Sequence, residues 1–366
     1  RLIPPSRGLI FDRMGTPIAL NEQNYKVVFI REQANDPAGV LKKLSTIIDL
    51  EEKRQKKIMQ DMKKRSSFIP ITVAENLTWK DFAKISVNLP SLPGIIPEVG
   101  LTRHYQEFES FAHVVGYVGP ISDKDLESEK PVDPVLQIPK FQIGKVGVEK
   151  KMEKHLRGRA GVSRVEVNAS GRVMRELNRT QGQSGGNIHL TIETNLQKFA
   201  SERLKGLSAS SVLMEIKSGD ILSLVSTPSY NPNNFVLGIS QSRWNALLND
   251  ERKPLLNKAT SGAYPPGSTF KMIVAAAALE LGLIGLNDKI FCSGFYELGS
   301  RKFHCWLKGG HGKLTLQEAI QKSCDVYFYE LARKVGVKSI GAMARRLGLG
   351  QAYNLPLTGL SKGFVP

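Results

Sequence analysis

The segment Gly262-Ala263-Tyr264-Pro265-Pro266-Gly267-Ser268-Thr269-Phe270-Lys271-Met272 decides how the second half of this chain is interpreted. Its two prolines and the glycine after them interrupt regular structure, so they predict a loop that ends at Ser268. An almost entirely apolar run of good helix formers follows, from Lys271 to Glu280, and predicts a buried helix. Positions i and i+3 share one face of a helix, so we expect Lys271 to lie beside the Ser268 hydroxyl.

A serine next to a lysine is an arrangement that can form an acyl-enzyme. A hydroxyl becomes a strong nucleophile only when a base takes its proton. Burial disfavours an ammonium, so a neutral Lys271 could be that base for Ser268. The positive potential of a helix N-terminus would favour the negative charge that develops there. The plainer alternative is a serine cap followed by a surface lysine, because S-x-x-K is a common sequence; the apolar helix behind Lys271 favours catalysis.

The triplet Ser323-Cys324-Asp325 is a second polar element, and it lies between two helical patterns at 316–321 and 326–335. A polar triplet between packed helices can direct its side chains into a cleft. Ser323 would then relay or share a proton, and Asp325 would hold Lys271 or orient Ser323. The alternative is that Ser323 or Asp325 simply caps the following helix.

The chain has three cysteines, and a histidine lies between the second and third. Cys292, Cys305, His311 and Cys324 follow the spacing C-x12-C-x5-H-x12-C. Three thiols and an imidazole suit a tetrahedral Zn2+ of structural type, with no open position for water. Such an ion would fix the triplet that contains Cys324.

Other interpretations of the cysteines remain open at this point. Two of them could form a disulfide in an oxidising compartment, or all three could be buried free thiols. His304 is a rival ligand, but in an extended segment it would face away from its neighbour Cys305.

Composition indicates an ordinary globular protein with a strong positive charge. The 366 residues suffice for two domains with separate cores, and no run of 18 apolar residues occurs. The net charge of +17 suggests anionic neighbours such as lipid or a wall polymer. The densest basic cluster, 53–65, predicts an amphipathic helix whose charged face is solvated rather than a specific binding patch. Nothing resembles a nucleic-acid-binding module, so we expect no nucleic-acid partner.

The pattern along the chain changes near residue 188. Residues 1–187 predict a mixed α/β, non-catalytic domain, with strands at 25–30, 68–73, 164–167 and 172–177 and helices at 37–49, 51–65, 78–87 and 147–156. The residues 168–171 predict a hairpin turn, and residues 180–186 a linker. Residues 188–366 predict a helix at 196–204, a hairpin of strands 211–216 and 221–226, and then core helices. This order indicates an α+β domain.

S-x-x-K followed about fifty residues later by S-x-[ND] is the arrangement of the penicilloyl-serine transferases. On these residues the chain resembles the class B penicillin-binding proteins. It most closely resembles the elongation-type penicillin-binding protein 2 group, because position 325 is Asp rather than Asn. Four other segments carry the resemblance: 4–15, 113–118, 144–149 and 224–232. It implies an elongated mixed α/β pedestal of the dimerisation type over 1–187 and a transpeptidase domain over 188–366.

The resemblance also implies roles and partners. Ser268 would be acylated by a stem peptide or a β-lactam antibiotic, with Lys271 as general base and Ser323 and Asp325 completing the proton relay. The pedestal would contact a membrane-embedded glycan polymerase of the elongation machinery. An N-terminal transmembrane helix, absent from this sequence, would anchor the protein at the periplasmic face of the bacterial inner membrane.

The resemblance bears on the cysteines as well. Elongation-type members hold a metal with an Asp, Asp, His and Cys set at similar positions. Cys292 and Cys305 stand here where others have Asp.

One departure from the family pattern concerns the third motif, K-[ST]-G. None follows Asp325, and Lys362-Gly363 has no Ser or Thr between its two residues. We therefore expect a transpeptidase domain that is incomplete at its C-terminus. The alternative functions are a class D β-lactamase or β-lactam sensor, which share S-x-x-K, and a non-catalytic scaffold for a membrane polymerase.

Overall fold

The computed structural model describes residues 1–169 and 172–365, which pack into two units. The N-terminal unit comprises Arg1–Ala259 with Pro356–Thr358, and the C-terminal unit comprises Thr260–Leu355 with the residues from Gly359 onward. Each unit is described by itself. These units divide the chain by compactness. The predicted boundary at residue 187 separates a pedestal from a transpeptidase domain, and it stays a prediction.

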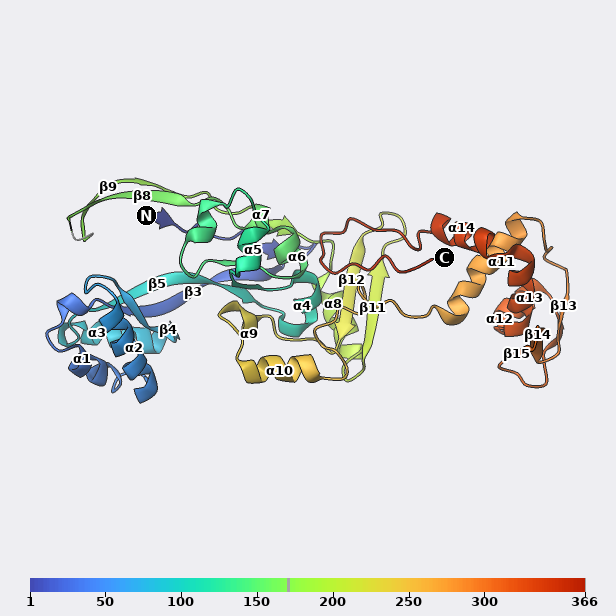
Figure 1. The fold of residues 1–366 in the computed structure, drawn as a ribbon, viewed down its shortest axis with the longest axis horizontal. Helices are drawn as coiled ribbons and strands as arrows, with labels where there is room; N and C mark the ends of the chain where they lie inside the picture. The colour runs from blue at the N-terminus through green and yellow to red at the C-terminus, as the bar shows by residue number, and fades with distance from the viewer. Residues whose placement is uncertain (170–171, 366) are drawn as a thin grey trace. The chain divides into compact units, whose positions relative to one another are not determined.

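The long strand β3 (Pro17–Phe29) organises the sheet of the N-terminal unit (Figure 1). The sheet has the order β10-β2-β3-β4, with β5 (Ile95–Tyr105) on the other side of β3; the remaining strands are β2 (Ile10–Phe11), β4 (Ile71–Leu77) and β10 (Ile188–His189). The sequence predicted only the second half of β3 and missed β5, because Pro97 and Gly100 normally interrupt strands. Since β5 pairs only with β3 it is an edge strand, where proline is tolerated.

Three helices cover the end of this sheet as the sequence predicts: α1 (Pro37–Leu44), α2 (Glu52–Lys64) and α3 (Trp79–Asn88) (Figure 1). Apolar residues Phe29, Leu41, Ile58 and Ile85 form a common core between helices and sheet. The lysines of α2 are exposed, whereas Ile58 and Met62, one turn apart, are buried. The predicted amphipathic helix is therefore confirmed.

A buried ion network joins three segments that are far apart in the sequence. Glu149, in α6 (Gly147–Lys151), accepts hydrogen bonds from Arg7 Nε at 2.7 Å, from Arg103 Nε at 2.8 Å and from the Tyr105 hydroxyl at 3.2 Å. The Glu149 side chain has no exposed surface. Burial opposes its ionisation, but the two guanidinium groups outweigh burial and hold the pKa of Glu149 below its ordinary value.

Residues 181–186 pack closely against the N-terminal unit and are not a linker. Gln183 and Arg159 exchange two backbone hydrogen bonds, of 2.8 and 3.0 Å, and Gly185 N donates to Ser6 O at 2.8 Å. A Cβ atom at Gly185 would lie 1.8 Å from the carbonyl oxygen of Leu156. The glycines of this segment therefore allow close backbone contact, which the sequence alone presents as flexibility.

The predicted hairpins of the N-terminal unit are confirmed. β8 (Gly161–Val167) pairs with β9 (Val173–Thr180), although part of their predicted turn lies outside the described residues. β11 (Ala209–Met214) pairs with β12 (Ile221–Thr227), and α8 (Thr194–Arg203) packs against β12. The buried Gln197 fixes α8 on β12, since its amide donates to Leu224 O and accepts from Leu224 N, both at 2.8 Å.

The other α-helices and strands of this unit are short. They are β1 (Leu2–Ile3), α4 (Phe108–Val115), β6 (Val118–Pro120), α5 (Asp123–Glu127), β7 (Gln142–Gly144), α7 (Glu153–Leu156), α9 (Asn233–Val236) and α10 (Gln241–Asn249). The predicted helix at 147–156 is thus two short helices, α6 and α7, separated at Met152.

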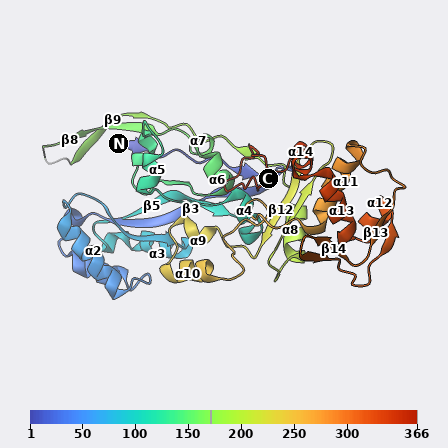
Figure 2. The same cartoon turned by 45° about the vertical axis from the view of Figure 1, so that its right-hand side comes forward.

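The C-terminal unit is built around α11 (Lys271–Glu280) and α13 (Asp325–Val335), which lie side by side in both views (Figures 1 and 2). α12 (Leu316–Gln321), α14 (Val337–Arg346) and two small hairpins complete it: β13 (Ile290–Cys292) with β16 (Gly312–Leu314), and β14 (Phe295–Leu298) with β15 (Arg301–His304). One face of α11 is buried, whereas Met272 is 60% exposed. No helix in the described part of the chain is long and apolar enough to cross a membrane.

We predict that Glu149→Gln destabilises the N-terminal unit by about 3–5 kcal/mol, because two buried guanidinium groups lose their shared carboxylate. Denaturant unfolding of both variants measures this. Folding lowers the pKa of Glu149 from 4.5. The difference in unfolding free energy between wild type and Glu149→Gln should therefore be constant at neutral pH and shrink only below about pH 4.5.

The matched control is Glu52→Gln, which removes an 81% exposed carboxylate from a surface pair with Lys56. We expect no measurable change for it, because exposed ion pairs contribute little. Equal unfolding free energies for Glu149→Gln and wild type at neutral pH would contradict the role of the network.

Candidate functional site

Ser268 lies in a single turn of 3-10 helix, η4 (Gly267–Phe270), directly before α11. Pro266 precedes this turn as its N-cap. Gly267 has φ of +56°, a conformation in which residues with a side chain are strained. The sequence therefore places the exposed residue Ser268 at a sharp turn into α11.

Lys271, the first residue of α11, is the hub of the site. Its Nζ donates to Asp325 Oδ1 at 2.6 Å, to Ser323 O at 2.9 Å and to Ser323 Oγ at 3.1 Å. These three acceptors match the three hydrogens of an ammonium group. The centroid of the Phe328 ring lies 5.8 Å from Nζ, so the ring covers another side of the ammonium group.

The link from Lys271 to Ser268 runs through a second hydroxyl. Ser323 Oγ donates to Ser268 Oγ at 2.9 Å while it accepts from Lys271. The sequence predicted a direct neighbour relation along one helical face. The structure instead has Ser323 as the intermediate, because Nζ is drawn toward Asp325 and the loop before α13.

The loop that carries Ser323 is short and strained. Ser323 has φ of +48°, in the left-handed region that is costly for a residue with a side chain. Cys324 is the N-cap of α13, and its Sγ accepts from Tyr327 N at 3.5 Å. The capping role considered for Ser323 or Asp325 belongs to Cys324, so both of the other side chains are available to Lys271.

Trp306 completes the site, and the sequence reasoning did not identify it. Its backbone N donates to Asp325 Oδ2 at 3.1 Å, so both carboxylate oxygens of Asp325 have a partner. Its indole Nε1 donates to Lys322 O at 3.0 Å. The available signal was its position directly after Cys305, a candidate ligand.

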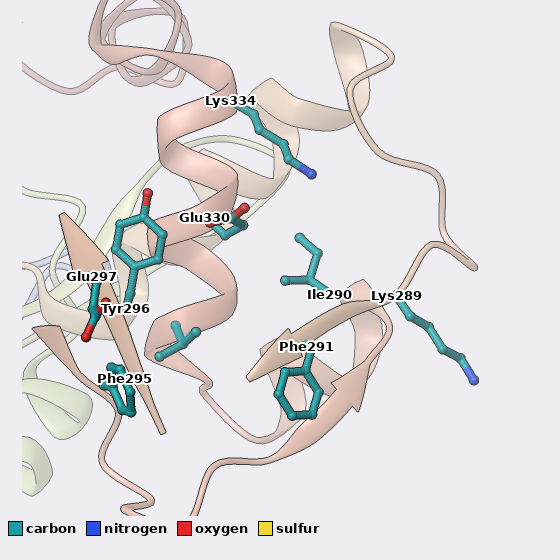
Figure 3. A pocket seen from close by; sticks show the side chains of 9 residues that line it. Lys289, Ile290, Phe291, Phe295, Tyr296, Glu297, Glu330 and Lys334 are labelled. Carbon is teal, nitrogen blue, oxygen red and sulfur yellow. The ribbon is translucent and has the colours of Figure 1, made fainter. Parts of the chain in front are cut away.

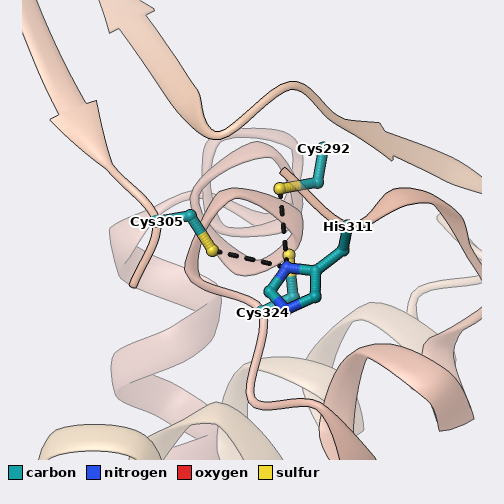
Figure 4. A group of neighbouring side chains, drawn as sticks. All are labelled: Cys292, Cys305, His311 and Cys324. Carbon is teal, nitrogen blue, oxygen red and sulfur yellow. Dashed lines mark hydrogen bonds between the residues drawn. The ribbon is translucent and has the colours of Figure 1, made fainter. Parts of the chain in front are cut away.

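The four candidate metal ligands come together in the C-terminal unit (Figure 4). The Sγ atoms of Cys292, Cys305 and Cys324 and a ring nitrogen of His311 all lie within 4.8 Å of one another. His311 Nδ1 is 3.7 Å from Cys292 Sγ and 3.5 Å from Cys305 Sγ. The three cysteines are buried free thiols, so the disulfide alternative does not apply in this structure.

These distances fit a tetrahedral ion. Zn–S and Zn–N bonds of about 2.3 and 2.0–2.1 Å place sulfur and nitrogen ligands about 3.6 Å apart. His304, the rival ligand, is exposed and lies outside the group. His311 Nε2 is buried and has no hydrogen-bond partner among the described residues, which leaves Nδ1 as the nitrogen that faces the thiols.

The thiols differ in their surroundings. Burial raises the pKa of a thiol, but backbone N–H groups around Cys305 outweigh burial and lower the pKa of Cys305 below its ordinary value. Cys324 accepts a single backbone N–H, from Tyr327, which does not offset burial, and burial raises its pKa to about 12. One thiol of the group is therefore held among donors that favour a thiolate, the form that binds metals.

A pocket of about 510 Å³ lies elsewhere on this unit, between β13, β14 and α13 (Figure 3). Its lining residues are Lys289, Ile290, Phe291, Phe295, Tyr296, Glu297, Val326, Glu330 and Lys334. Ser268, Lys271, Ser323 and Asp325 do not line this pocket.

Family models match nearly the whole chain. The penicillin-binding protein dimerisation domain matches residues 2–190, and the penicillin-binding protein transpeptidase domain matches residues 209–366. These matches confirm the predicted α+β architecture in which a pedestal precedes a transpeptidase domain.

Curated relatives are longer than this chain. The peptidoglycan D,D-transpeptidase MrdA of Escherichia coli strain K12 is 36% identical over 371 residues, covering 100% of this chain and 59% of that protein. MrdA of Acinetobacter baumannii is 35% identical over 366 residues, covering 100% of this chain and 54% of that protein. The chain thus spans somewhat more than half the length of these relatives.

Solved structures give the same assignment. Penicillin-binding protein PBP2 of Helicobacter pylori, in a complex with MreC, matches with a TM-score of 0.84 at 29% identity, over 100% of this chain and 68% of that one. PBP2 of Pseudomonas aeruginosa, in complex with WCK 5153, matches with a TM-score of 0.70 at 30% identity, over 100% of this chain and 60% of that one. This chain belongs to the penicillin-binding protein family.

Proposed function

We propose that the chain is part of a peptidoglycan D,D-transpeptidase that cross-links stem peptides through an acyl-enzyme at Ser268. The hydrogen-bonded series Lys271 Nζ, Ser323 Oγ and Ser268 Oγ carries this proposal, at 3.1 and 2.9 Å. It connects a nucleophile to a basic group through one hydroxyl, which is what serine acylation requires. The similarity to MrdA transpeptidases supports the substrate class.

Acylation would use the series in the reverse direction. The Ser268 proton passes to Ser323, and the Ser323 proton passes to Lys271, which must first be neutral. Ser268 Oγ then bonds to the carbonyl carbon of the penultimate D-Ala. As the peptide C–N bond breaks, the protonated Lys271 returns a proton by way of Ser323 to the departing amine of the terminal D-Ala.

Cross-linking would follow from the ester. The amine of a neighbouring stem peptide attacks the acyl carbon and forms a new amide. The ester C–O bond breaks, and Ser268 Oγ recovers a proton that the attacking amine has released. Asp325 would hold Lys271 between these steps, since its Oδ1 is 2.6 Å from Nζ. A penicillin would acylate the same oxygen, but no amine is released from its ring.

Similarity to the family also supports a proposal for the partners and the location. Stem peptides and β-lactam antibiotics would bind at Ser268, and the pedestal would contact a membrane-embedded glycan polymerase during cell elongation and shape maintenance. An anchor in the inner membrane would place both units in the periplasm. Helicobacter pylori PBP2, which is similar to this chain, has been solved in a complex with MreC, so a protein of that kind is a further candidate for the pedestal.

We also propose that Cys292, Cys305, His311 and Cys324 hold a structural Zn2+. Their ligand atoms lie within 4.8 Å of one another, and three thiolates with an imidazole form a closed tetrahedral set. The ion would supply a rigid crosslink and no catalysis. Because Cys324 is the residue between Ser323 and Asp325, the crosslink would hold the strained loop in place.

We predict that fluorescent penicillin labels the wild-type protein and leaves Ser268→Ala unlabelled, because the attacking oxygen is gone. Lys271→Ala should label at least about 100-fold more slowly, since a general base typically contributes that much. Gel fluorescence over time measures both. Ser339→Ala, in α14, is the control and should label at the wild-type rate.

Equal labelling of Ser268→Ala and wild type would contradict the assignment of the nucleophile. A long-lived label agrees with a transpeptidase. Rapid loss of the label, with turnover of a chromogenic cephalosporin, would favour a class D β-lactamase or related sensor. No label on a folded wild-type protein would favour a non-catalytic scaffold.

We predict about one zinc ion per chain in protein purified without chelator, and near zero in His311→Ala. Removal of the metal should lower the midpoint of thermal unfolding, because binding stabilises only the folded state. Elemental analysis and thermal unfolding measure the two effects. His304→Ala, an exposed neighbour of Cys305, should keep both the zinc and the midpoint. Zinc-free wild-type protein with an unchanged midpoint would contradict the site.

A further inference from the structure

Trp306 combines high exposure with two bonds into the loop of Ser323. Its side chain and backbone leave it 64% exposed, yet its indole Nε1 donates to Lys322 O at 3.0 Å. Its backbone N donates to Asp325 Oδ2 at 3.1 Å. Trp306 therefore contacts the residue before Ser323 and the residue two after it.

The loop between these contacts has a conformation that needs support. Ser323 has φ of +48°, and a non-glycine residue keeps such a value only when its surroundings hold it there. The same residue must keep its hydroxyl 2.9 Å from Ser268 Oγ and 3.1 Å from Lys271 Nζ. Relaxation of the backbone at Ser323 would swing its hydroxyl away from both.

Trp306 is itself well placed to resist that relaxation. It follows Cys305, whose buried Sγ is 3.5 Å from His311 Nδ1. Its ring meets the His311 ring edge-to-face, with centroids 5.2 Å apart. The indole is thus fixed on one side to the cysteine and histidine group and on the other to the loop.

We propose that Trp306 is a positioning residue for acylation of Ser268. Its Nε1 bond to Lys322 O and its N–H bond to Asp325 hold Ser323 in the left-handed conformation that lines up the three polar groups. This role rests on the proposed acyl-transfer function. It requires no contact between Trp306 and the substrate.

The experiment measures fluorescent-penicillin labelling of the full chain over a range of penicillin concentrations. This separates the affinity of the first complex from the rate constant of acylation. Trp306→Phe keeps a ring against His311 and removes the Nε1 donor, whereas Trp306→Ala removes both. Trp79→Phe is the matched control, because Trp79 has nearly the same exposure, 65%, and lies in the N-terminal unit.

We expect Trp306→Phe to lower the acylation rate constant about three- to tenfold, as the loss of one hydrogen bond allows, with affinity and thermal midpoint unchanged. Trp79→Phe should acylate as wild type does. An unchanged rate constant in Trp306→Phe would overturn the positioning role. So would weaker affinity at an unchanged rate constant, which indicates ligand contact, or a rate loss matched by a lower thermal midpoint.

Trp306→Ala removes the ring as well as the Nε1 donor, so we expect it to lower the acylation rate constant at least as much as Trp306→Phe. A folded, zinc-retaining Trp306→Ala with the wild-type acylation rate constant would overturn the proposal. Wild-type protein that does not label would instead overturn the proposed function, and this proposal with it.

Discussion

The arrangement of the C-terminal unit depends on the hydrogen bonds that the ammonium group of Lys271 donates to Ser323 and Asp325. Its three acceptors come from one loop, and they tie the start of α11 to the start of α13. A half-buried cation with a carboxylate at 2.6 Å fixes both side chains at once. The strained backbone at Ser323 follows, because its carbonyl and its hydroxyl must both face the same nitrogen.

Each unit pairs a charged side chain that folding removes from water: Glu149 in the N-terminal unit and Lys271 in the C-terminal unit. In the N-terminal unit, Glu149 is enclosed by Arg7 and Arg103, which belong to an opening segment and an edge strand. A buried charge without a partner is costly, so the three segments are favoured in positions that keep Glu149 paired with both guanidinium groups. In both units the charged partners lie on different elements, and they fix how those elements pack.

Local patterns predicted most helices and failed where backbone contact decides. The apolar spacing of α2 and α3 and the turn residues between β11 and β12 were sufficient, because each signal lies within a few residues. β5 was missed because Pro97 and Gly100 indicate a break, and only its pairing with β3 reveals an edge strand. The prediction of a linker at residues 181–186 was wrong, because glycine-rich sequences occur both in flexible linkers and where two backbones pack closely. Gly185 belongs to the second kind, since Leu156 leaves no space for a side chain.

The sequence by itself determined the chemistry available at the site: Ser268 and Lys271 at a loop-to-helix junction, a polar triplet between helices, and a group of cysteines around His311. Those features are local in the chain, so spacing and turn residues suffice to find them. Only the tertiary structure decided that Lys271 reaches Ser268 through Ser323. It alone placed Trp306 across the loop. These outcomes depend on contacts between residues 16 to 55 positions apart, and no local pattern encodes which of several polar groups will meet when α11 and α13 pack together.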